Sequence, residues 1–288
     1  MKEVYLYKKL KDKKVQCRNC AHFCVIENGK RGICRVRENQ EGKLYALNYG
    51  KAVACHIDPI EKKPLYHFLP GTYSLSIATV GCNFKCLFCQ NWEISQAREI
   101  TGEDLFPQDI IKTAKEHKLP SISYTYTEPA IFSEYALDTM KLAKKEGIKN
   151  IWVTNGFWSK ELFDLISPYL DAVNCDLKSL EEEFYRKYCS ARLQPVLDTL
   201  KRLKDKKIWV EVTTLAIPTL SDREEIFAKI ANFIKKELGS ETPWHISRFF
   251  PEVSWQLQLL PPTSIETLKK GKEIGEKLGL KNVYLGNV

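Results

Sequence analysis

From about residue 73 to residue 288, short apolar runs alternate with segments of helical periodicity. The apolar runs that predict strands lie at 75–80, 122–126, 151–154, 172–177, 208–217 and 244–249. The periodic segments that predict helices lie at 131–146, 160–166, 195–204, 224–238 and 264–278. This alternation predicts an α/β fold with a parallel sheet, and six such units predict a partial TIM-type (βα)6 barrel.

Polar residues gather where the predicted strands end. In a parallel barrel the loops at the carboxyl ends of the strands converge, so we expect one site there. The residues predicted to meet are Thr127, Glu128, Thr154, Asn155, Asp176, Lys178 and His245. Each also has a plainer interpretation taken alone: Glu128 can begin a helix, Asn155 can form a turn, and His245 can be a hydrogen-bonded core histidine.

Three cysteines follow the first predicted strand. Cys82, Cys86 and Cys89 stand in a C-x3-C-x2-C pattern. Three thiolates hold a four-iron cluster and leave one iron open to another ligand. A structural zinc site is the alternative, but such a site needs four ligands, and no histidine or fourth cysteine stands nearby in the sequence.

A second cysteine group lies near the start of the chain. Cys17, Cys20, Cys24 and Cys34 form C-x2-C-x3-C-x9-C among frequent turn residues. Four thiolates saturate either a zinc ion or an iron-sulfur cluster, so both remain open and neither leaves a free position.

A change from a turn-rich first part to alternating strands and helices divides the chain into two predicted domains. Residues 1–72 form a small Cys-rich metal-binding domain, and residues 73–288 form the barrel. Within the first domain, residues 43–49 and 51–57 predict a hairpin-like pair of strands around Gly50. Residues 58–71 predict an irregular connection because of their prolines and charges.

The cysteine count and the absence of long apolar runs bear on the cellular compartment. No run approaches the ~20 apolar residues of a membrane helix, and the first residues lack the apolar core of a signal peptide. Ten cysteines without a secretory signal predict metal ligands in the cytoplasm rather than disulfides. The net charge of +8 comes from scattered lysines, so we expect solvated helix faces and no nucleic-acid partner.

The cysteine spacing, with the aromatic Phe88 just before the last cysteine, resembles the cluster motif of radical S-adenosylmethionine (SAM) enzymes. The resemblance implies a 4Fe-4S cluster whose open iron is chelated by SAM. It implies reductive cleavage of SAM to a 5'-deoxyadenosyl radical, which abstracts hydrogen from a substrate. It also implies a flavodoxin or ferredoxin-like electron donor, and a protein or small-molecule substrate.

Further motifs resemble the activating enzymes of glycyl-radical proteins. Tyr126-Thr127-Glu128-Pro129 stands where that family has Gly-Gly-Glu-Pro, so Glu128 is implied to pair with the amino group of SAM. The remaining residues implied to contact SAM are Phe88, Thr127, Thr154, Asn155, Asp176, Lys178 and His245. Val153 replaces an aspartate that these enzymes often carry.

Nearly the whole chain is similar to the radical SAM member of the AmmeMemoRadiSam system, on the four-cysteine start, residues 58–68 and residues 81–92. That resemblance implies an unidentified modification reaction. Glycyl-radical activation, as by the pyruvate formate-lyase activating enzymes, is the alternative function. A zinc-dependent nucleic-acid or protein-binding module is a further alternative, which leaves Cys82, Cys86 and Cys89 unexplained.

Overall fold

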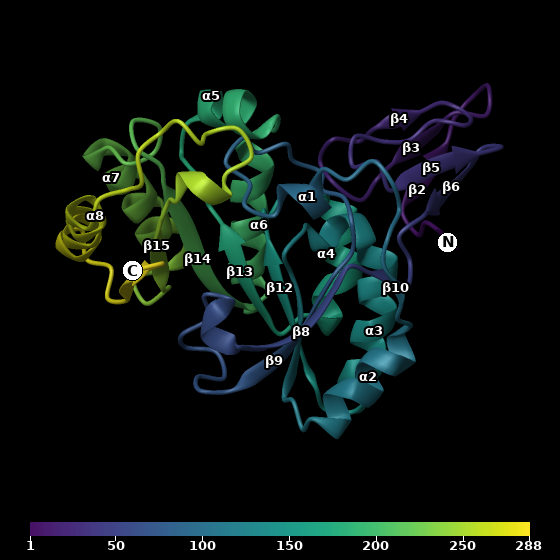
Figure 1. Ribbon diagram of the computed structural model, residues 1–288, viewed down its shortest axis with the longest axis horizontal. Coiled ribbons are helices and arrows are strands. Elements are labelled where there is room, and N and C mark those ends of the chain that lie inside the picture. Colours follow the sequence, from purple (N-terminus) through teal and green to yellow (C-terminus); the bar gives the residue numbers. More distant parts are fainter.

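A computed structural model describes residues 1–288 and is built around one eight-stranded sheet, in the order β16-β15-β14-β13-β12-β11-β9-β8 (Figure 1). Its strands are β8 (Ala54–Pro59), β9 (Tyr73–Ala78), β11 (Ser121–Tyr124), β12 (Lys149–Thr154), β13 (Ala172–Asp176), β14 (Trp209–Ala216), β15 (Trp244–Arg248) and β16 (Val283–Gly286). All neighbouring pairs are parallel except β8 with β9.

Helices connect the parallel strands and pack outside the sheet. They are α1 (Trp92–Ser95), α2 (Pro107–Glu116), α3 (Ser133–Lys145), α4 (Lys160–Ile166), α5 (Glu182–Phe184), α6 (Gln194–Asp205), α7 (Glu224–Phe233) and α8 (Ile265–Lys277). Single 3-10 turns lie at Ile60–Lys62, Pro129–Phe132, Ser167–Tyr169 and Pro251–Val253, and wider turns at Tyr185–Cys189 and Ile234–Leu238. None of the helices has the length and apolar character needed to cross a membrane.

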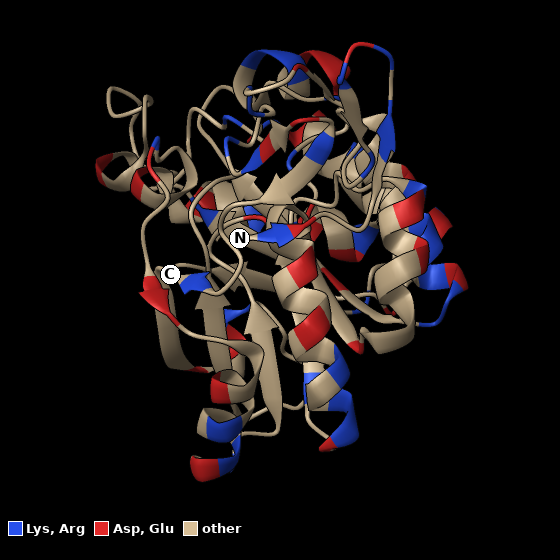
Figure 2. Ribbon diagram, turned by 90° about the vertical axis from the view of Figure 1, so that its right-hand side faces the viewer, with Lys and Arg blue, Asp and Glu red and all other residues tan.

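The expected α/β fold with six strand–helix units is confirmed. Buried apolar side chains from both layers form the main core, and serine caps define two helix starts: Ser159 accepts from the Leu162 amide at 2.9 Å, and Ser264 from the Thr267 amide at 3.0 Å. On the helices, Lys and Arg are interspersed with Asp and Glu (Figure 2), so the positive charges are scattered along these helices.

The predicted hairpin around Gly50 is wrong. This part of the chain forms three strands, β6 (Lys43–Ala46), β7 (Lys51–Ala52) and β8. No two of these three strands pair with each other. Instead β8 pairs antiparallel with β9 over six residues, from Ala54 opposite Ala78 to Pro59 opposite Tyr73. The physical reason is that β9 would otherwise be an open edge of the large sheet, with unpaired backbone groups that β8 satisfies.

Residues 60–71 close the lower end of the barrel in Figure 1, and we call this segment the plug. Its backbone is held from inside: Asn174 donates to the carbonyl of Pro64 at 2.8 Å, and Glu211 accepts from the amides of Tyr66 and His67 at 3.0 and 2.9 Å. The irregular connection expected from the prolines is therefore an ordered floor beneath the carboxyl ends of the strands.

The first residues form a small lobe beside the barrel (Figure 1). Strands β2 (Tyr7–Lys9), β3 (Val15–Cys17) and β4 (Val25–Ile26) make one sheet, and β1 (Lys2–Glu3), β6 and β5 (Arg37–Gln40) make another. β7 pairs with β10 (Glu103–Asp104). A buried ion pair at 2.7 Å between Arg37 and Glu134 of α3 joins the lobe to the barrel.

Candidate active site

A large cavity opens at the carboxyl ends of the strands, above the plug. It holds about 1480 Å³, counting its open mouth. Of the barrel residues predicted from the sequence, all but His245 line it: Cys82, Cys86, Phe88, Cys89, Thr127, Glu128, Thr154, Asn155, Asp176 and Lys178. The expected convergence at one end of a parallel barrel is therefore observed for these side chains.

The cysteine loop that follows β9 is tightly seated. Gly81 has a φ of +99°, and a Cβ there would lie 2.6 Å from Val36 and 2.9 Å from the carbonyl of Cys34. The amide of Phe84 donates to the Cys82 sulfur at 3.4 Å, and the Cys89 sulfur lies 3.3 Å from the Ser95 hydroxyl. Two of the three thiols thus have a polar partner beside them, and three thiols on one loop fit the ligand set of an iron-sulfur cluster.

Glu128 is a buried carboxylate with an unusual number of donors. It accepts from the Thr154 hydroxyl at 2.7 and 2.9 Å, the Asn155 amide at 2.8 Å, the Ala130 amide at 3.1 Å and the Trp158 indole at 3.2 Å. Burial raises the pKa of Glu128, and these hydrogen bonds only partly oppose it. A desolvated carboxylate facing a cavity is suited to pair with an ammonium group.

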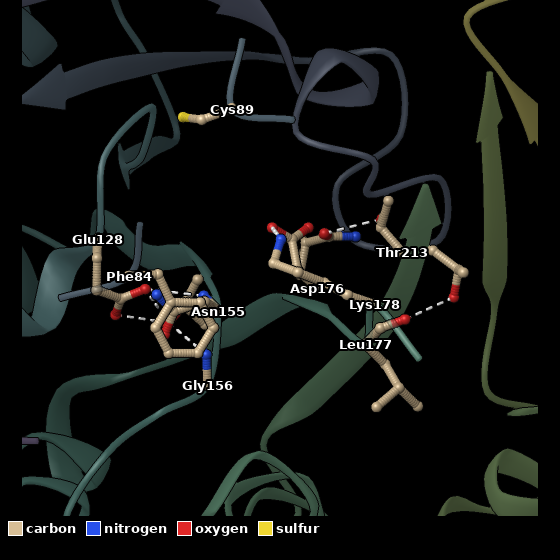
Figure 3. A network of polar contacts seen from close by, with 12 residues as sticks. Phe84, Cys89, Glu128, Asn155, Gly156, Asp176, Leu177, Lys178 and Thr213 are labelled. Atoms are coloured by element: carbon tan, nitrogen blue, oxygen red, sulfur yellow. Dashed lines mark hydrogen bonds and ion pairs between the residues drawn. The ribbon is translucent and has the colours of Figure 1, made fainter. Parts of the chain in front are cut away.

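Asp176 and Lys178 form a charged pair at the end of β13, which lies two strands away from β11 in the sheet. Lys178 donates to Asp176 at 2.8 Å, and its amine lies 5.5 Å from the centre of the Phe88 ring. Burial opposes the charge, but Asp176 and the nearby thiols outweigh burial and raise the pKa of Lys178. Figure 3 shows Glu128 at the left and Asp176 near the centre, on separate strand ends, with Cys89 above both.

Tyr126, two residues before Glu128, has a backbone conformation that glycine favours. Its φ is +61°, in the left-handed region that glycine adopts freely. Contacts on both sides hold it: its hydroxyl donates to Asp58, and its carbonyl accepts from Asn91 at 2.9 Å. The backbone therefore keeps a glycine-like conformation although a tyrosine occupies the position.

His245 is not brought into the cavity. It is the second residue of β15 and lies one layer below Ser247, which does line the cavity. Its Nε2 is 2.7 Å from the Glu211 carboxylate, and the rings of Tyr66 and Tyr284 pack on it at 4.6 and 5.4 Å. This placement corresponds to the plainer interpretation of a hydrogen-bonded core histidine.

The floor of the cavity carries charged residues that no sequence pattern indicated. Lys62 and Lys63 of the plug line the cavity, and both donate to Asp58, at 2.8 and 2.6 Å. The charges of residues 58–63 were the available signal, but nothing in a linear pattern indicates that a connection enters a barrel.

The four N-terminal cysteines surround a second, smaller cavity. Cys17, Cys20, Cys24 and Cys34 all line it, and it holds about 330 Å³, counting its open side. The loop that carries Cys20 runs along the segment after Asn155. Cys20 and Trp158 form an isolated antiparallel β-bridge, and the Ser159 amide donates to the backbone carbonyl of Asn19 at 3.2 Å. All four thiols therefore line one cavity next to the large one, although no three of them are placed to share a single metal ion.

Comparisons with known proteins agree with this geometry. The family model described as the radical SAM superfamily matches residues 76–231. An uncharacterized protein of Methanocaldococcus jannaschii is 46% identical over 290 residues, which cover 100% of this chain and 86% of that protein. The pyruvate formate-lyase 1-activating enzyme of Escherichia coli K12 is 25% identical over 220 residues, covering 71% of this chain and 89% of that enzyme.

A solved structure shares the fold. The radical SAM methyltransferase from Sphaerobacter thermophilus superposes with a TM-score of 0.58 at 14% identity, covering 76% of this chain and 67% of that one. At this identity the likeness concerns the fold alone.

Proposed function

The chain belongs to the radical SAM superfamily, and on that premise we propose that it cleaves SAM reductively and abstracts hydrogen from a substrate still to be identified. The observation that carries the proposal is the single cavity shared by Cys82, Cys86, Cys89 and the buried carboxylate of Glu128. When bound, a 4Fe-4S cluster supplies the electron that breaks SAM into methionine and a 5'-deoxyadenosyl radical.

We assign roles to the side chains around that cavity. Cys82, Cys86 and Cys89 hold the cluster and leave one iron for SAM. Glu128 binds the ammonium of SAM, and its donors Thr154 and Asn155 fix the carboxylate in place. Each such charge-assisted contact contributes about 1.5 to 3 kcal/mol.

The other side of the cavity orients the rest of SAM. Lys178 binds the carboxylate or a ribose hydroxyl, with Asp176 fixing its amine, and Phe88 packs on the adenine. Thr127, whose hydroxyl donates to the Thr79 carbonyl at 2.8 Å, shapes the backbone beside Glu128. His245 lies one layer below the cavity. It contacts Glu211, whose carboxylate holds two backbone amides of the plug.

Two reactions within this class are candidates. The similarity of residues 58–68 and 81–92 to the radical SAM member of the AmmeMemoRadiSam system favours an unidentified modification. The 25% identity to an enzyme that activates pyruvate formate-lyase favours glycyl-radical activation as the second candidate. Electron paramagnetic resonance of a co-expressed glycyl-radical protein separates them, because only activation leaves a glycyl doublet on that protein.

We further propose a two-part organisation, in which residues 1–72 carry a second metal centre on Cys17, Cys20, Cys24 and Cys34, of zinc or iron-sulfur type. A flavodoxin or ferredoxin-like protein supplies electrons. Because ten free cysteines need a reducing compartment, we propose the cytoplasm.

The test is anaerobic reconstitution followed by SAM cleavage with dithionite. Replacing Cys82, Cys86 and Cys89 by Ala should abolish formation of 5'-deoxyadenosine. Cys55→Ala is the matched control, because Cys55 is exposed and lies at neither cavity. A triple variant that still forms 5'-deoxyadenosine at the wild-type rate would overturn the proposal.

A further inference from the structure

A further cysteine lies beside the cysteine loop that follows β9, although it is far from that loop in the sequence. Cys189 ends the wide turn that follows α5. The amides on either side of Cys86 bind this turn. The Lys85 amide donates to the carbonyl of Cys189 at 3.0 Å. The Leu87 amide donates to the carbonyl of Tyr188 at 2.9 Å. The two bonds hold the backbone of Cys86 against the end of the turn.

The side chains of Cys86 and Cys189 also meet. A hydrogen bond with the Cys189 thiol is the largest cause that raises the pKa of Cys86. Backbone segments joined by hydrogen bonds hold facing Cα atoms about 5 Å apart. A disulfide spans Cα atoms that are about 4.4 to 6.8 Å apart. Both cysteines are free thiols, so the pair is placed to form a disulfide.

The two thiols differ in how solvent reaches them. Cys86 lines the large cavity, which has an open mouth, whereas Cys189 is fully buried behind it and does not line the cavity. A small oxidant in the cavity therefore meets the Cys86 sulfur first. Cys189 then lies where the resolving thiol lies in redox-sensitive cysteine pairs.

The other two cysteines of the loop have polar partners of another kind. The Cys82 sulfur accepts from the Phe84 amide at 3.4 Å. The Cys89 sulfur lies 3.3 Å from the Ser95 hydroxyl. Cys86 is thus the member of the loop whose hydrogen-bond partner is itself a thiol.

We infer that Cys86 and Cys189 form a disulfide when the loop carries no cluster and a peroxide enters the cavity. Hydrogen peroxide oxidises the Cys86 thiol to a sulfenic acid and leaves as one water. The Cys189 sulfur then attacks the Cys86 sulfur, the S–O bond breaks, and the oxygen leaves as a second water. The two thiols together lose two electrons and two protons, and the peroxide is reduced. A dithiol such as dithiothreitol reverses the reaction.

The disulfide has a consequence for the cluster proposed above. It withdraws Cys86 from the ligand set, and it protects the Cys86 sulfur from irreversible oxidation to sulfinic acid. After reduction the loop is again able to take up iron and sulfide. This consequence rests on the proposed function, whereas the disulfide itself does not.

Peptide mapping of the full chain tests the disulfide. The reduced, cluster-free protein is treated with equimolar hydrogen peroxide and digested with trypsin without reductant. We expect peptide 86–98 to be joined to peptide 188–192. Because the first peptide also contains Cys89, the link should persist in Cys89→Ser and be lost in Cys86→Ser. A link within the loop instead, or a free Cys189 thiol in a chain with wild-type circular dichroism, overturns the inference.

Iron uptake tests the protective role. The wild-type protein and Cys189→Ser are exposed to rising amounts of peroxide, reduced with dithiothreitol and reconstituted with iron and sulfide. We expect the variant to lose iron uptake irreversibly at a lower amount of peroxide, each chain being compared with its own untreated sample. The exposed Cys55 supplies the control, and Cys55→Ser should behave as the wild type.

The outcomes of the iron measurement are distinct from those of the peptide map. Equal sensitivity of the wild-type protein and Cys189→Ser to peroxide overturns the protective role. Both chains keep the four N-terminal cysteines, so metal bound there does not produce a difference between them. If the untreated wild-type protein takes up no iron, the proposed function fails instead, and the peptide map still decides the disulfide.

Discussion

Thr154 donates its hydroxyl to both oxygens of the Glu128 carboxylate, with oxygen–oxygen distances of 2.7 and 2.9 Å. The two residues end neighbouring parts of the sheet, Thr154 as the last residue of β12 and Glu128 just after β11. The contact fixes a buried negative charge at the wall of the large cavity.

Glu128→Gln removes the charge and keeps the shape. We expect SAM affinity to fall by about tenfold or more, the equivalent of one charge-assisted hydrogen bond. Calorimetric titration of the anaerobic, reconstituted protein measures it, and Glu116→Gln on the exposed face of α2 is the control. An unchanged dissociation constant would remove Glu128 from the binding site.

The pH dependence of SAM binding follows from the same carboxylate. Burial raises the pKa of Glu128, so acidification protonates it earlier than an exposed glutamate. Protonation removes the charge that binds ammonium, and the affinity of the wild-type protein should therefore weaken as pH falls from neutrality toward the raised pKa. The Glu128→Gln variant should show a flatter profile over that range, and parallel profiles would contradict the assignment.

Asp58→Asn should destabilise the fold by about 3 kcal/mol, because it leaves the buried Lys63 amine without its anion. Burial alone would raise the pKa of Asp58, but donors from Lys62, Lys63 and Tyr126 hold it well below its usual range. The stabilisation is therefore complete above about pH 5 and is lost as pH falls through the folded pKa.

Urea unfolding between neutral and acidic pH measures both effects of Asp58→Asn. The variant should be less stable at neutral pH and should lose less stability on acidification. Asp164→Asn is the matched control, since the Lys160–Asp164 pair is exposed and contributes about 0.5 kcal/mol or less. Equal losses in the two variants would mean that the Lys63 amine finds water or another partner.

Gly156→Ala should destabilise the protein by more than Gly147→Ala. Both glycines have left-handed backbones, with φ of +70° and +74°, so both variants lose about 1 to 2 kcal/mol from that strain. Only at Gly156 would the new Cβ also lie 2.8 Å from the Cys175 sulfur, whereas nothing lies within 4 Å at Gly147. The difference between the two unfolding free energies isolates the close approach, and equal values would contradict the packing around Thr154 and Asn155.

Glu211→Gln should loosen the plug. The carboxylate accepts from the amides of Tyr66 and His67 and contacts His245, so its replacement weakens the floor of the barrel. We expect hydrogen exchange at the Tyr66 and His67 amides to accelerate while exchange in α3 stays unchanged. Unaltered protection of the two plug amides would mean that the Pro64 contact with Asn174 suffices to hold the segment.

The sequence predicted the strands and helices of the barrel well because their apolar periodicity is strong. It missed α2, although Ile110, Ile111 and Ala114 are buried there at helical spacing, and it missed β16, which is short and partly exposed at the sheet edge. The strand partner of residues 51–57 was also predicted wrongly. β8 pairs with β9, which follows only after the plug, and no local pattern in the sequence indicates such a partner.

The depth at which a side chain lies inside the barrel could not be predicted from the sequence either. Asp176 is the last residue of β13 and reaches the cavity, whereas His245 is the second residue of β15 and stays below it. A linear pattern identifies a strand but not which of its inward residues stands in the top layer, because that depends on register and tilt between strands.

The pairing of β8 with β9 makes the N-terminal part of the chain difficult to separate from the barrel. A fragment beginning at residue 73 would lack β8 and the plug, and it would expose the backbone groups of β9 together with the buried face of Glu211. We expect such a fragment to aggregate through that bare edge. Grafting the cysteine lobe onto another radical SAM barrel would accordingly require the transfer of residues 1–72 together with β9, as one continuous piece of chain.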